Sequence, residues 1–259
     1  MSEDGIARDG MKPGDLAVIT GAGGGFGRAF ARRFARLGAR LSLWDIDEKA
    51  GEAIVVEARA LGADAQFLKV DLADPAAIDA AVGNTLSSMG TPYCIINNAS
   101  VFPRGEVLEL SLADWDLTLK VNITAPFLIV KSFGPTMIEE GRGNVINLAS
   151  GRALEGAPKG ANYACTKAAI LSLTKSLALE WARHGIRVNA IVPGQSLTAM
   201  PLAATPEEKL HANAKTRVPL GRIGYPEDMA GLAAFLVSPD AAYMTGQGVA
   251  MNGGVVMVP

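Results

Sequence analysis

Residues 15–37 read DLAVITGAGGGFGRAFARRFARL, and this stretch decides the fold. Residues 15–20 form a short apolar run that predicts a buried strand, and residues 25–37 carry apolar side chains at helical spacing. The turn between them is rich in glycine, which lets the chain bend sharply and lets backbone N–H groups approach a phosphate at the helix start. These glycines could serve only a tight turn, but the strand-turn-helix setting favours a dinucleotide-binding unit. Its residues are Thr20, Gly21, Gly25, Phe26 and Gly27.

Short β-branched runs alternate with longer helical patterns along the rest of the chain. We expect strands at residues 15–20, 40–45, 65–70, 93–97, 144–149, 186–192 and 248–252. We expect helices at residues 25–37, 47–61, 75–89, within 112–140, 161–184 and 227–237. This alternation predicts an α/β fold, a single-domain doubly wound parallel sheet (Rossmann fold) of about seven strands with helices on both faces. Ligands of such a sheet bind beyond the carboxyl ends of its strands.

Composition and charge narrow the class of protein. The 259 residues carry a net charge of -2 with lysine and arginine scattered, so nucleic acid is not an expected partner. Cys94 and Cys165 are too few for a disulfide framework and indicate a reducing cytoplasm. Residues 1–14 are polar and predict a flexible leader, and no stretch has the unbroken apolarity of a membrane span. We therefore expect a cytoplasmic protein with one domain, residues 15–259, no membrane contact and a small-molecule partner.

Asp45 ends the second expected strand, 24 residues after Gly21. A carboxylate at this place of a dinucleotide-binding unit accepts hydrogen bonds from the adenosine ribose hydroxyls. It would repel a 2′-phosphate, so it favours NAD over NADP. The alternative is that Asp45 caps the following helix, although Asp47 is as good a candidate for that role.

Tyr163 and Lys167 stand four residues apart at the start of a long helical segment, so they share one helical face. A phenol with a pKa of about 10 is a poor general acid or base at neutral pH, and a neighbouring ammonium makes it easier to ionise. The pair could therefore move protons. Alone, the same spacing is more typical of a solvated helix edge.

From residue 14 onward the chain resembles the short-chain dehydrogenases/reductases of the single-domain type. The family's Thr-Gly-x3-Gly-x-Gly pattern begins at Thr20, and its Asn-Asn-Ala-Gly pattern appears at residues 97–100 with serine in place of the last glycine. Ser150 lies 13 residues before Tyr163, which is the family's spacing between its catalytic serine and tyrosine. The ordered series of matches is specific, although each match alone is weak.

The resemblance implies a catalytic tetrad of Asn122, Ser150, Tyr163 and Lys167, in an NAD-dependent oxidoreductase that interconverts a secondary alcohol and a ketone. Tyr163 would be the general acid and base, Lys167 would lower its pKa and hold the nicotinamide ribose, and Ser150 would bond the substrate oxygen. Asn122 would position a water, or would make a buried structural hydrogen bond. The alternative to an enzyme is a non-enzymatic NAD-binding module on a dehydrogenase scaffold, which would be expected to lose catalytic residues.

The cofactor site implied by the resemblance combines the glycine turn with the ends of later strands. Asp71 would contact adenine or cap the following helix. Ser100 adds a side chain where the backbone of the family passes near the nicotinamide ribose. The expected NAD-binding residues are Thr20, Gly21, Gly25, Phe26, Gly27, Asp45, Ile46, Asp71, Leu72, Asn98, Ala99, Tyr163, Lys167, Pro193, Gly194 and Thr198.

The substrate is expected to meet Ser150, Arg152, Leu154 and Gln195, which lie in loops after the strands. Arg152 would meet a polar or anionic group of the substrate, or would lie in solvent. The segment at residues 195–217 is expected to be a substrate loop that closes as a lid.

Assembly is expected from the helical stretches at residues 112–140 and 161–184. These stretches carry more apolar and small residues than one contact with a sheet needs. The resemblance implies a homotetramer that associates through them and through the last helix and strand.

A metal site is not expected. His184 and His211 are far apart in the sequence, and no cysteine or carboxylate cluster stands near either at ligand spacing.

Overall fold

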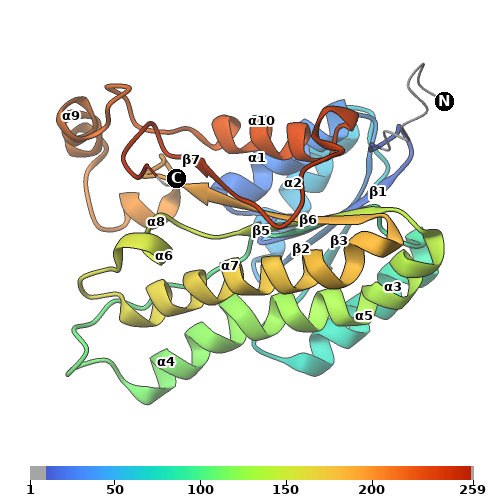
Figure 1. The fold of residues 1–259 in the computed structure, drawn as a ribbon, viewed down its shortest axis with the longest axis horizontal. Coiled ribbons are helices and arrows are strands. Elements are labelled where there is room, and N and C mark those ends of the chain that lie inside the picture. Colours follow the sequence, from blue (N-terminus) through green and yellow to red (C-terminus); the bar gives the residue numbers. More distant parts are fainter. Residues whose placement is uncertain (1–9, 258–259) are drawn as a thin grey trace.

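The computed structural model describes residues 10–257, and within this range seven parallel strands form one sheet (Figure 1). The strand order is β3-β2-β1-β4-β5-β6-β7. Strands β2 and β3 therefore lie on one side of β1, and β4 to β7 lie on its other side, so the order reverses between β1 and β4. Ligands of doubly wound sheets bind at this switch point. The strands are β1 (Leu16–Thr20), β2 (Arg40–Asp45), β3 (Ala65–Lys69), β4 (Cys94–Asn97), β5 (Gly143–Leu148), β6 (Ile186–Pro193) and β7 (Gly248–Met251).

Helices cover both faces of the sheet (Figure 1). Ala17 and Ile19 of β1 pack with α1, α2 and α10, while Val18 packs on the other face with α3, α5 and α7. This alternation follows from the two-residue period of a strand. The α-helices are α1 (Gly25–Arg36), α2 (Glu48–Ala60), α3 (Pro75–Met89), α4 (Leu112–Leu119), α5 (Ala125–Glu140), α6 (Arg152–Glu155), α7 (Ala161–Trp181), α8 (Ala199–Leu202), α9 (Glu207–Arg217) and α10 (Pro226–Leu236).

The predicted fold class is confirmed, and the predicted strands and long helices are present with small shifts of their ends. The structure adds α6, α8 and α9, which lie in segments that the sequence pattern marked only as loops. Helix α9 is mostly polar and buries only Leu210 and Ala214, which pack with Ile223. Short helices of this kind depend on tertiary packing, so their own sequence carries little signal.

The long helical stretch at Leu112–Glu140 is divided by a π-helical turn, Lys120–Thr124. Pro126 has no N–H and cannot donate to the carbonyl four residues earlier, that of Asn122, so the regular ladder is interrupted here. The N–H of Ala125 bonds instead to the carbonyl of Lys120, five residues back. The turn places Asn122, which is buried, opposite the loop after β4.

The stretch Leu112–Glu140 is also the one part of the described chain that is long and apolar enough to cross a membrane, by length and composition alone. Half of the window that passes this test is buried in the domain. Its side chains Ile129 and Phe133 are fully buried against the sheet. The apolar character of the stretch is therefore that of a core helix.

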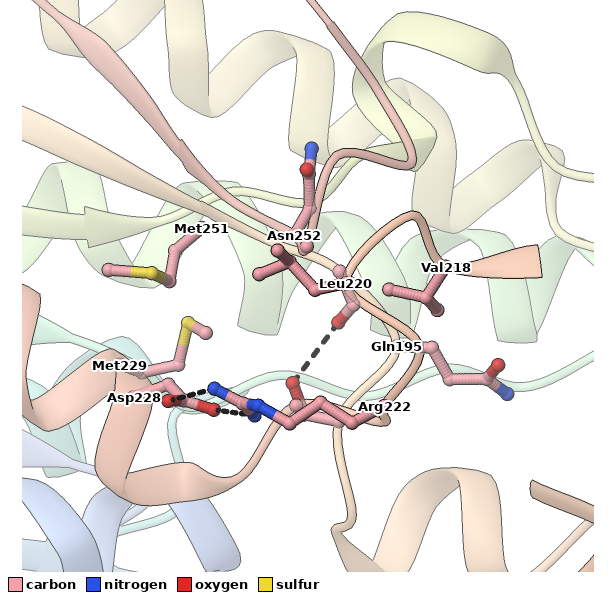
Figure 2. A pocket seen from close by; sticks show the side chains of 12 residues that line it. Gln195, Val218, Leu220, Arg222, Asp228, Met229, Met251 and Asn252 are labelled. Carbon is pink, nitrogen blue, oxygen red and sulfur yellow. Dashed lines mark hydrogen bonds and ion pairs between the residues drawn. The ribbon is translucent and has the colours of Figure 1, made fainter. Parts of the chain in front are cut away.

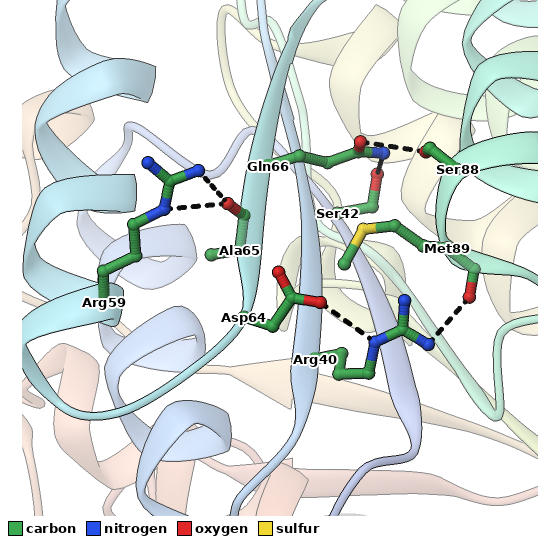
Figure 3. A network of polar contacts seen from close by, with 8 residues as sticks. All are labelled: Arg40, Ser42, Arg59, Asp64, Ala65, Gln66, Ser88 and Met89. Atoms are coloured by element: carbon green, nitrogen blue, oxygen red, sulfur yellow. Dashed lines mark hydrogen bonds and ion pairs between the residues drawn. The ribbon is translucent and has the colours of Figure 1, made fainter.

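A polar network holds β2 and β3 against the end of α3 (Figure 3). Arg40 donates to Asp64 at 3.1 Å and to the carbonyl of Met89 at 3.0 Å. Gln66 bridges Ser42 on β2 and Ser88 on α3.

Part of the expected N-terminal leader is packed against the domain. Gly10 is buried, and the N–H of Met11 bonds to the carbonyl of Val237 at 2.8 Å. Residues 1–9 of the leader lie outside the described residues.

Candidate active site

A cavity of about 720 Å³ opens beyond the carboxyl ends of the strands and extends along the switch point. It brings together the glycine turn after β1, Asp45 at the end of β2, Asp71 after β3, and the side chains of Ser150, Tyr163 and Lys167. Residues that are far apart in the sequence therefore line one continuous site, as the sequence predicted for a dinucleotide.

The glycine turn is possible only with glycine at several places. Gly21 has a φ of +63°, which is the left-handed region that side chains disfavour. A Cβ on Gly27 would overlap the carbonyl oxygen of Gly21, and one on Gly25 would lie 3.0 Å from the side chain of Thr198. The turn therefore presents bare backbone at the start of α1, where N–H groups favour a phosphate. Gly21, Gly25 and Phe26 line the cavity, and Gly27 does not.

Asp45 lines the cavity with its carboxylate held in place. It accepts hydrogen bonds from the N–H of Gly23 at 2.8 Å and from the N–H of Asp47 at 3.0 Å. The cap of α2 is Asp47, whose side chain accepts from the N–H of Ala50 at 3.0 Å. Asp45 is therefore not the cap of α2. Its neighbour Ile46 also lines the cavity.

Asp71 and Leu72 also line the cavity, after the end of β3. Asp71 accepts from the N–H of Ala73 at 2.8 Å, whereas the cap of α3 is Asp74. The helix-capping alternative for Asp71 is therefore not what the structure shows. Its contact with adenine remains a prediction.

Thr20 joins the glycine turn to the loop after β4. Its Oγ1 accepts from the N–H groups of Asn98 at 3.0 Å and Ala99 at 3.1 Å. The side chain of Asn98 donates in return to the carbonyls of Thr20 and Gly21. Asn98 and Ala99 line the cavity, while Thr20 is buried behind them and acts by holding both loops.

Tyr163 and Ser150 form the candidate proton-transfer pair. Burial raises the pKa of Tyr163, and a hydrogen bond with Ser150 and the charge of Arg152 act to lower it. Lys167 lies beneath the tyrosine, with Nζ 5.4 Å from the centroid of its ring. The arrangement places a hydroxyl pair and a lysine where a substrate oxygen could be bonded from two sides.

Lys167 differs from the expectation in one respect. Burial lowers its pKa to about 7, and its Nζ donates to the carbonyl of Leu148 at 2.8 Å. From the sequence, we expected the ammonium of Lys167 to lower the pKa of Tyr163. In the structure, burial instead raises the pKa of Tyr163 overall, and the groups that act against this rise are Ser150 and Arg152.

Asn122 is fully engaged by protein groups. Its Oδ1 accepts from the N–H of Val101 at 2.9 Å, and its Nδ2 donates to the carbonyl of Val101 at 3.0 Å and to Oγ1 of Thr166 at 3.2 Å. Of the two interpretations made from the sequence, the buried structural hydrogen bond is the one that this side chain makes. Positioning of a water by Asn122 remains a prediction.

The expected substrate residues are only partly brought together. Ser150 lines the cavity, but Arg152 lies at the surface beside Glu155, 3.8 Å away, and Leu154 is also exposed. Gln195 lines a second, smaller cavity of about 30 Å³ (Figure 2). That cavity also contains the ion pair of Arg222 and Asp228, with contacts of 2.7 and 2.9 Å.

Two residues that line the main cavity, Leu117 and Val121, were not expected from the sequence. They are apolar side chains from α4 and from the π-helical turn that follows it. An apolar residue on a helix that also buries one face does not show whether it lines a cavity or packs in the core. Met200 lines the cavity too, and it belongs to the segment at residues 195–217 that was expected near the substrate.

The cofactor site of Pro193, Gly194 and Thr198 follows β6. Pro193 and Thr198 line the main cavity, whereas Gly194 lines the small one. A Cβ on Gly194 would lie 2.7 Å from the Cα of Asn252, so glycine is needed here for close packing.

The residues present fit a dinucleotide. The cavity is of the size that such cofactor sites reach, the glycine turn leaves backbone exposed at a helix start, and Asp45 is held at the far end. Ser100 lines the cavity, and its Oγ is buried with no hydrogen-bond partner among residues 10–257. A bound ligand with hydroxyl groups would supply that missing partner. Within residues 10–257, no group of three or more His, Cys, Asp or Glu side chains could hold a metal ion.

The sheet order, glycine turn and hydroxyl pair define a dinucleotide-binding oxidoreductase of the α/β class. A family model described as enoyl-(acyl carrier protein) reductase matches residues 21–256. The chain belongs to the short-chain dehydrogenase/reductase family of oxidoreductases.

Relatives cover nearly the whole chain. A 2,5-dichloro-2,5-cyclohexadiene-1,4-diol dehydrogenase of Sphingobium indicum is 35% identical, over 93% of this chain and 96% of the relative. A 3-oxoacyl-(acyl-carrier-protein) reductase of Staphylococcus aureus is 34% identical, over 95% of this chain and 100% of the relative. The crystal structure of a putative NAD(P) dependent gluconate 5-dehydrogenase of Beutenbergia cavernae, with NADP bound at low occupancy, is 36% identical. It superimposes with a TM-score of 0.88, over 93% of this chain and 96% of the other.

Proposed function

We propose that this protein is an NAD-dependent oxidoreductase that interconverts a secondary alcohol and a ketone, with Tyr163 as general acid and base. The observation that carries the proposal is the hydrogen-bonded pair of Tyr163 and Ser150 in the wall of a cavity that fits a dinucleotide. A cavity with this pair at one end and Asp45 at the other provides for both proton transfer and cofactor binding.

Each side chain of the site has a separate role in the proposed reaction. When bound, the dinucleotide supplies hydride transfer to or from the carbon that bears the substrate oxygen. As a phenolate, Tyr163 takes the hydroxyl proton when the alcohol is oxidised, and as a neutral phenol it gives a proton to the oxygen when the ketone is reduced. Ser150 donates a hydrogen bond to the same oxygen and stabilises the charge that develops there. Lys167 would hold the ribose of the bound dinucleotide.

The preference for NAD rests on Asp45. Its carboxylate is held by two backbone N–H groups, so it cannot easily turn away from a 2′-phosphate. A phosphate there would meet a fixed negative charge. The Beutenbergia cavernae relative was crystallised with NADP, and a test must therefore include both cofactors.

The substrate is best sought among the chemical classes that the relatives represent. A first panel of candidate substrates consists of D-gluconate, cis-1,2-cyclohexanediol and 3-hydroxybutyryl coenzyme A, and each is assayed with NAD and with NADP. The three compounds stand for a sugar acid, a cyclic diol and a hydroxyacyl thioester. Absorbance of the reduced nicotinamide reports turnover for all of them.

Replacement of Tyr163 by phenylalanine tests the proton-transfer role. Tyr163→Phe keeps the ring and removes the hydroxyl, so turnover is expected to fall by about 10²–10⁴-fold while NADH binding is kept. Tyr243→Phe is the matched control, because the side chain of Tyr243 is fully exposed. Full turnover in Tyr163→Phe would show that the role is wrongly assigned. NADH binding with no turnover on a broadened panel of alcohols and ketones would favour the non-enzymatic module.

We also propose that the protein is a homotetramer that associates through α4, α5 and α7. Exposed apolar side chains on these helices support the proposal, since Leu112 is 72% exposed and Leu179 is 85% exposed. Sedimentation at several protein concentrations measures the assembly. A monomer at all concentrations would contradict the proposal.

A further inference from the structure

Phe102 lies in the loop after β4, and its ring is stacked on the ring of Tyr163. The two centroids are 4.4 Å apart and the planes are inclined by 20°. The guanidinium of Arg104 lies over the same Phe102 ring, 4.6 Å from its centroid. Stacked aromatic pairs of this kind stabilise one another beyond their buried area. One face of the candidate acid and base is thus covered by a side chain from another part of the chain.

The backbone on both sides of Phe102 is anchored. The preceding residue, Val101, exchanges two hydrogen bonds with the side chain of Asn122. The carbonyl of the following residue, Pro103, accepts from Nδ2 of Asn162 at 3.0 Å. These anchors are buried, so the loop has little freedom to carry the ring away from Tyr163.

Gly160 leaves the space that the ring fills. A Cβ on Gly160 would lie 2.6 Å from Cζ and 2.7 Å from Cε2 of Phe102. The start of α7, which carries Tyr163 three residues later, is therefore shaped to accept the edge of this ring. Three separate features, the stack, the anchors and the glycine, place Phe102 against the tyrosine.

We propose that Phe102 is a positioning residue for proton transfer, which fixes the ring of Tyr163 and shields it from water. The inference rests on the proposed function, because it acts through Tyr163. It assigns to Phe102 no contact with the reacting atoms.

The proposal has two physical consequences. A stacked ring restricts the rotation of Tyr163, so its hydroxyl stays in the position that the substrate oxygen must reach. A ring that covers the phenol also keeps water away, and burial is the largest influence on Tyr163, raising its pKa. Removal of the ring should therefore change both the rate and the pH at which Tyr163 ionises.

Direct titration of Tyr163 tests the shielding without a substrate. Tyrosinate absorbance is followed against pH in the full chain, and the curve of Tyr163→Phe is subtracted to isolate Tyr163. In the same way, the curve of the double variant Phe102→Ala with Tyr163→Phe is subtracted from the curve of Phe102→Ala. The difference is the titration of Tyr163 without the Phe102 ring. The pKa of Tyr163 is expected to fall toward the ordinary value of 10 in Phe102→Ala. An unchanged titration overturns the shielding.

Kinetics tests the positioning, with the alcohol of the panel that gives the highest turnover with NAD. Phe102→Ala is expected to lower kcat by about 10- to 100-fold, with a smaller effect on KM. Phe102→Tyr keeps a flat ring and should restore kcat, whereas Phe102→Leu keeps apolar bulk without the stack and should not. A kcat of wild-type size in both Phe102→Ala and Phe102→Leu overturns the positioning role. Phe235→Ala, which truncates a half-exposed phenylalanine on α10, is the control.

Gly160→Ala provides an independent test of the same contact. The added methyl should displace the Phe102 ring and lower kcat, and the combination with Phe102→Ala should cost less than the sum of the two single changes. Strict additivity would count against the proposal. NADH binding, measured in parallel, shows that each variant is folded.

The outcomes separate this inference from the proposed function. If Tyr163→Phe keeps full turnover, the proposed function fails and the inference fails with it. If Tyr163→Phe loses turnover while Phe102→Ala keeps the wild-type kcat and titration, only the inference fails.

Discussion

Nζ of Lys167 on α7 donates a hydrogen bond to the carbonyl oxygen of Leu148 at the end of β5, 2.8 Å away. The lysine is 3% exposed, and burial lowers its pKa to about 7. This deeply buried amine is hydrogen-bonded to a backbone carbonyl at the carboxyl end of β5, with Nζ 5.4 Å from the centroid of the Tyr163 ring. Burial of this amine should destabilise the folded protein at pH values where the lysine is charged.

The stability of the protein should depend on pH through Lys167. The ordinary pKa of the side chain is 10.5, and in the folded protein it is about 7. Between these values the unfolded chain binds more protons, so the free energy of unfolding rises with pH. The destabilisation is fully present below pH 7 and disappears above 10.5. Lys167→Met should therefore be more stable than wild type below pH 7, by on the order of a few kcal/mol.

Denaturant unfolding at a series of pH values measures this effect. The advantage of Lys167→Met over wild type should shrink as the pH rises from 7 toward 10.5. Lys175→Met is the control, because Lys175 lies exposed on the same helix and its change should show no such trend. A difference between Lys167→Met and wild type that stays constant over this range would contradict the assignment.

Asp45 should determine the choice between NADH and NADPH. Asp45→Ser removes the fixed carboxylate that faces the ribose end of the cavity. The ratio of the Kd for NADPH to the Kd for NADH is expected to fall by about tenfold or more, which corresponds to about 1.4 kcal/mol. Quenching of protein fluorescence on titration with each cofactor gives both constants.

Asp47→Ala is the matched change for this test. It removes the cap of α2 and should cost about 1 kcal/mol of stability, with no change in the ratio of the two constants. Asp47 also lines the cavity, so a shift in Asp47→Ala as strong as that in Asp45→Ser would show that the specificity does not belong to the Asp45 carboxylate alone.

The fold could be predicted from local patterns because each element carries its own signal. The apolar run at β1, the glycine turn and the spacing of Tyr163 and Lys167 are all read within short windows. The choice between Asp45 and Asp47 could not be made in this way. Both carboxylates stand near the start of one helix, and only the three-dimensional path of the chain shows which one caps it.

The side-chain contacts around the candidate active site could not be predicted from the sequence. The stack of Phe102 on Tyr163 joins residues 61 positions apart, and no periodicity relates them. Arg152 and Gln195 were expected near the substrate because their loops follow the correct strands, but a loop's place in the chain does not determine where its side chains lie. Side-chain contacts between loops depend on packing that a linear pattern does not record.

Asn122 should contribute strongly to the stability of the folded protein, because its side chain makes three hydrogen bonds. Asn122→Ala would leave the N–H and carbonyl of Val101 and a contact of Thr166 without their partner. Unpaired buried polar groups each cost about 1–3 kcal/mol, so a loss of about 2–4 kcal/mol is expected. Asn84→Ala, at an exposed position of α3, should change stability by less than about 0.5 kcal/mol.

Turnover should fall in Asn122→Ala as well, because Val101 anchors the loop that carries Phe102 over Tyr163. Denaturant unfolding measures the stability, and kcat of the folded variant measures the effect on the loop. If Asn122 acted only through a bound water, its change would lower kcat and leave the unfolding midpoint near that of wild type. A large drop in the midpoint supports the loop anchor, since Asn122→Ala removes three protein hydrogen bonds from the folded state.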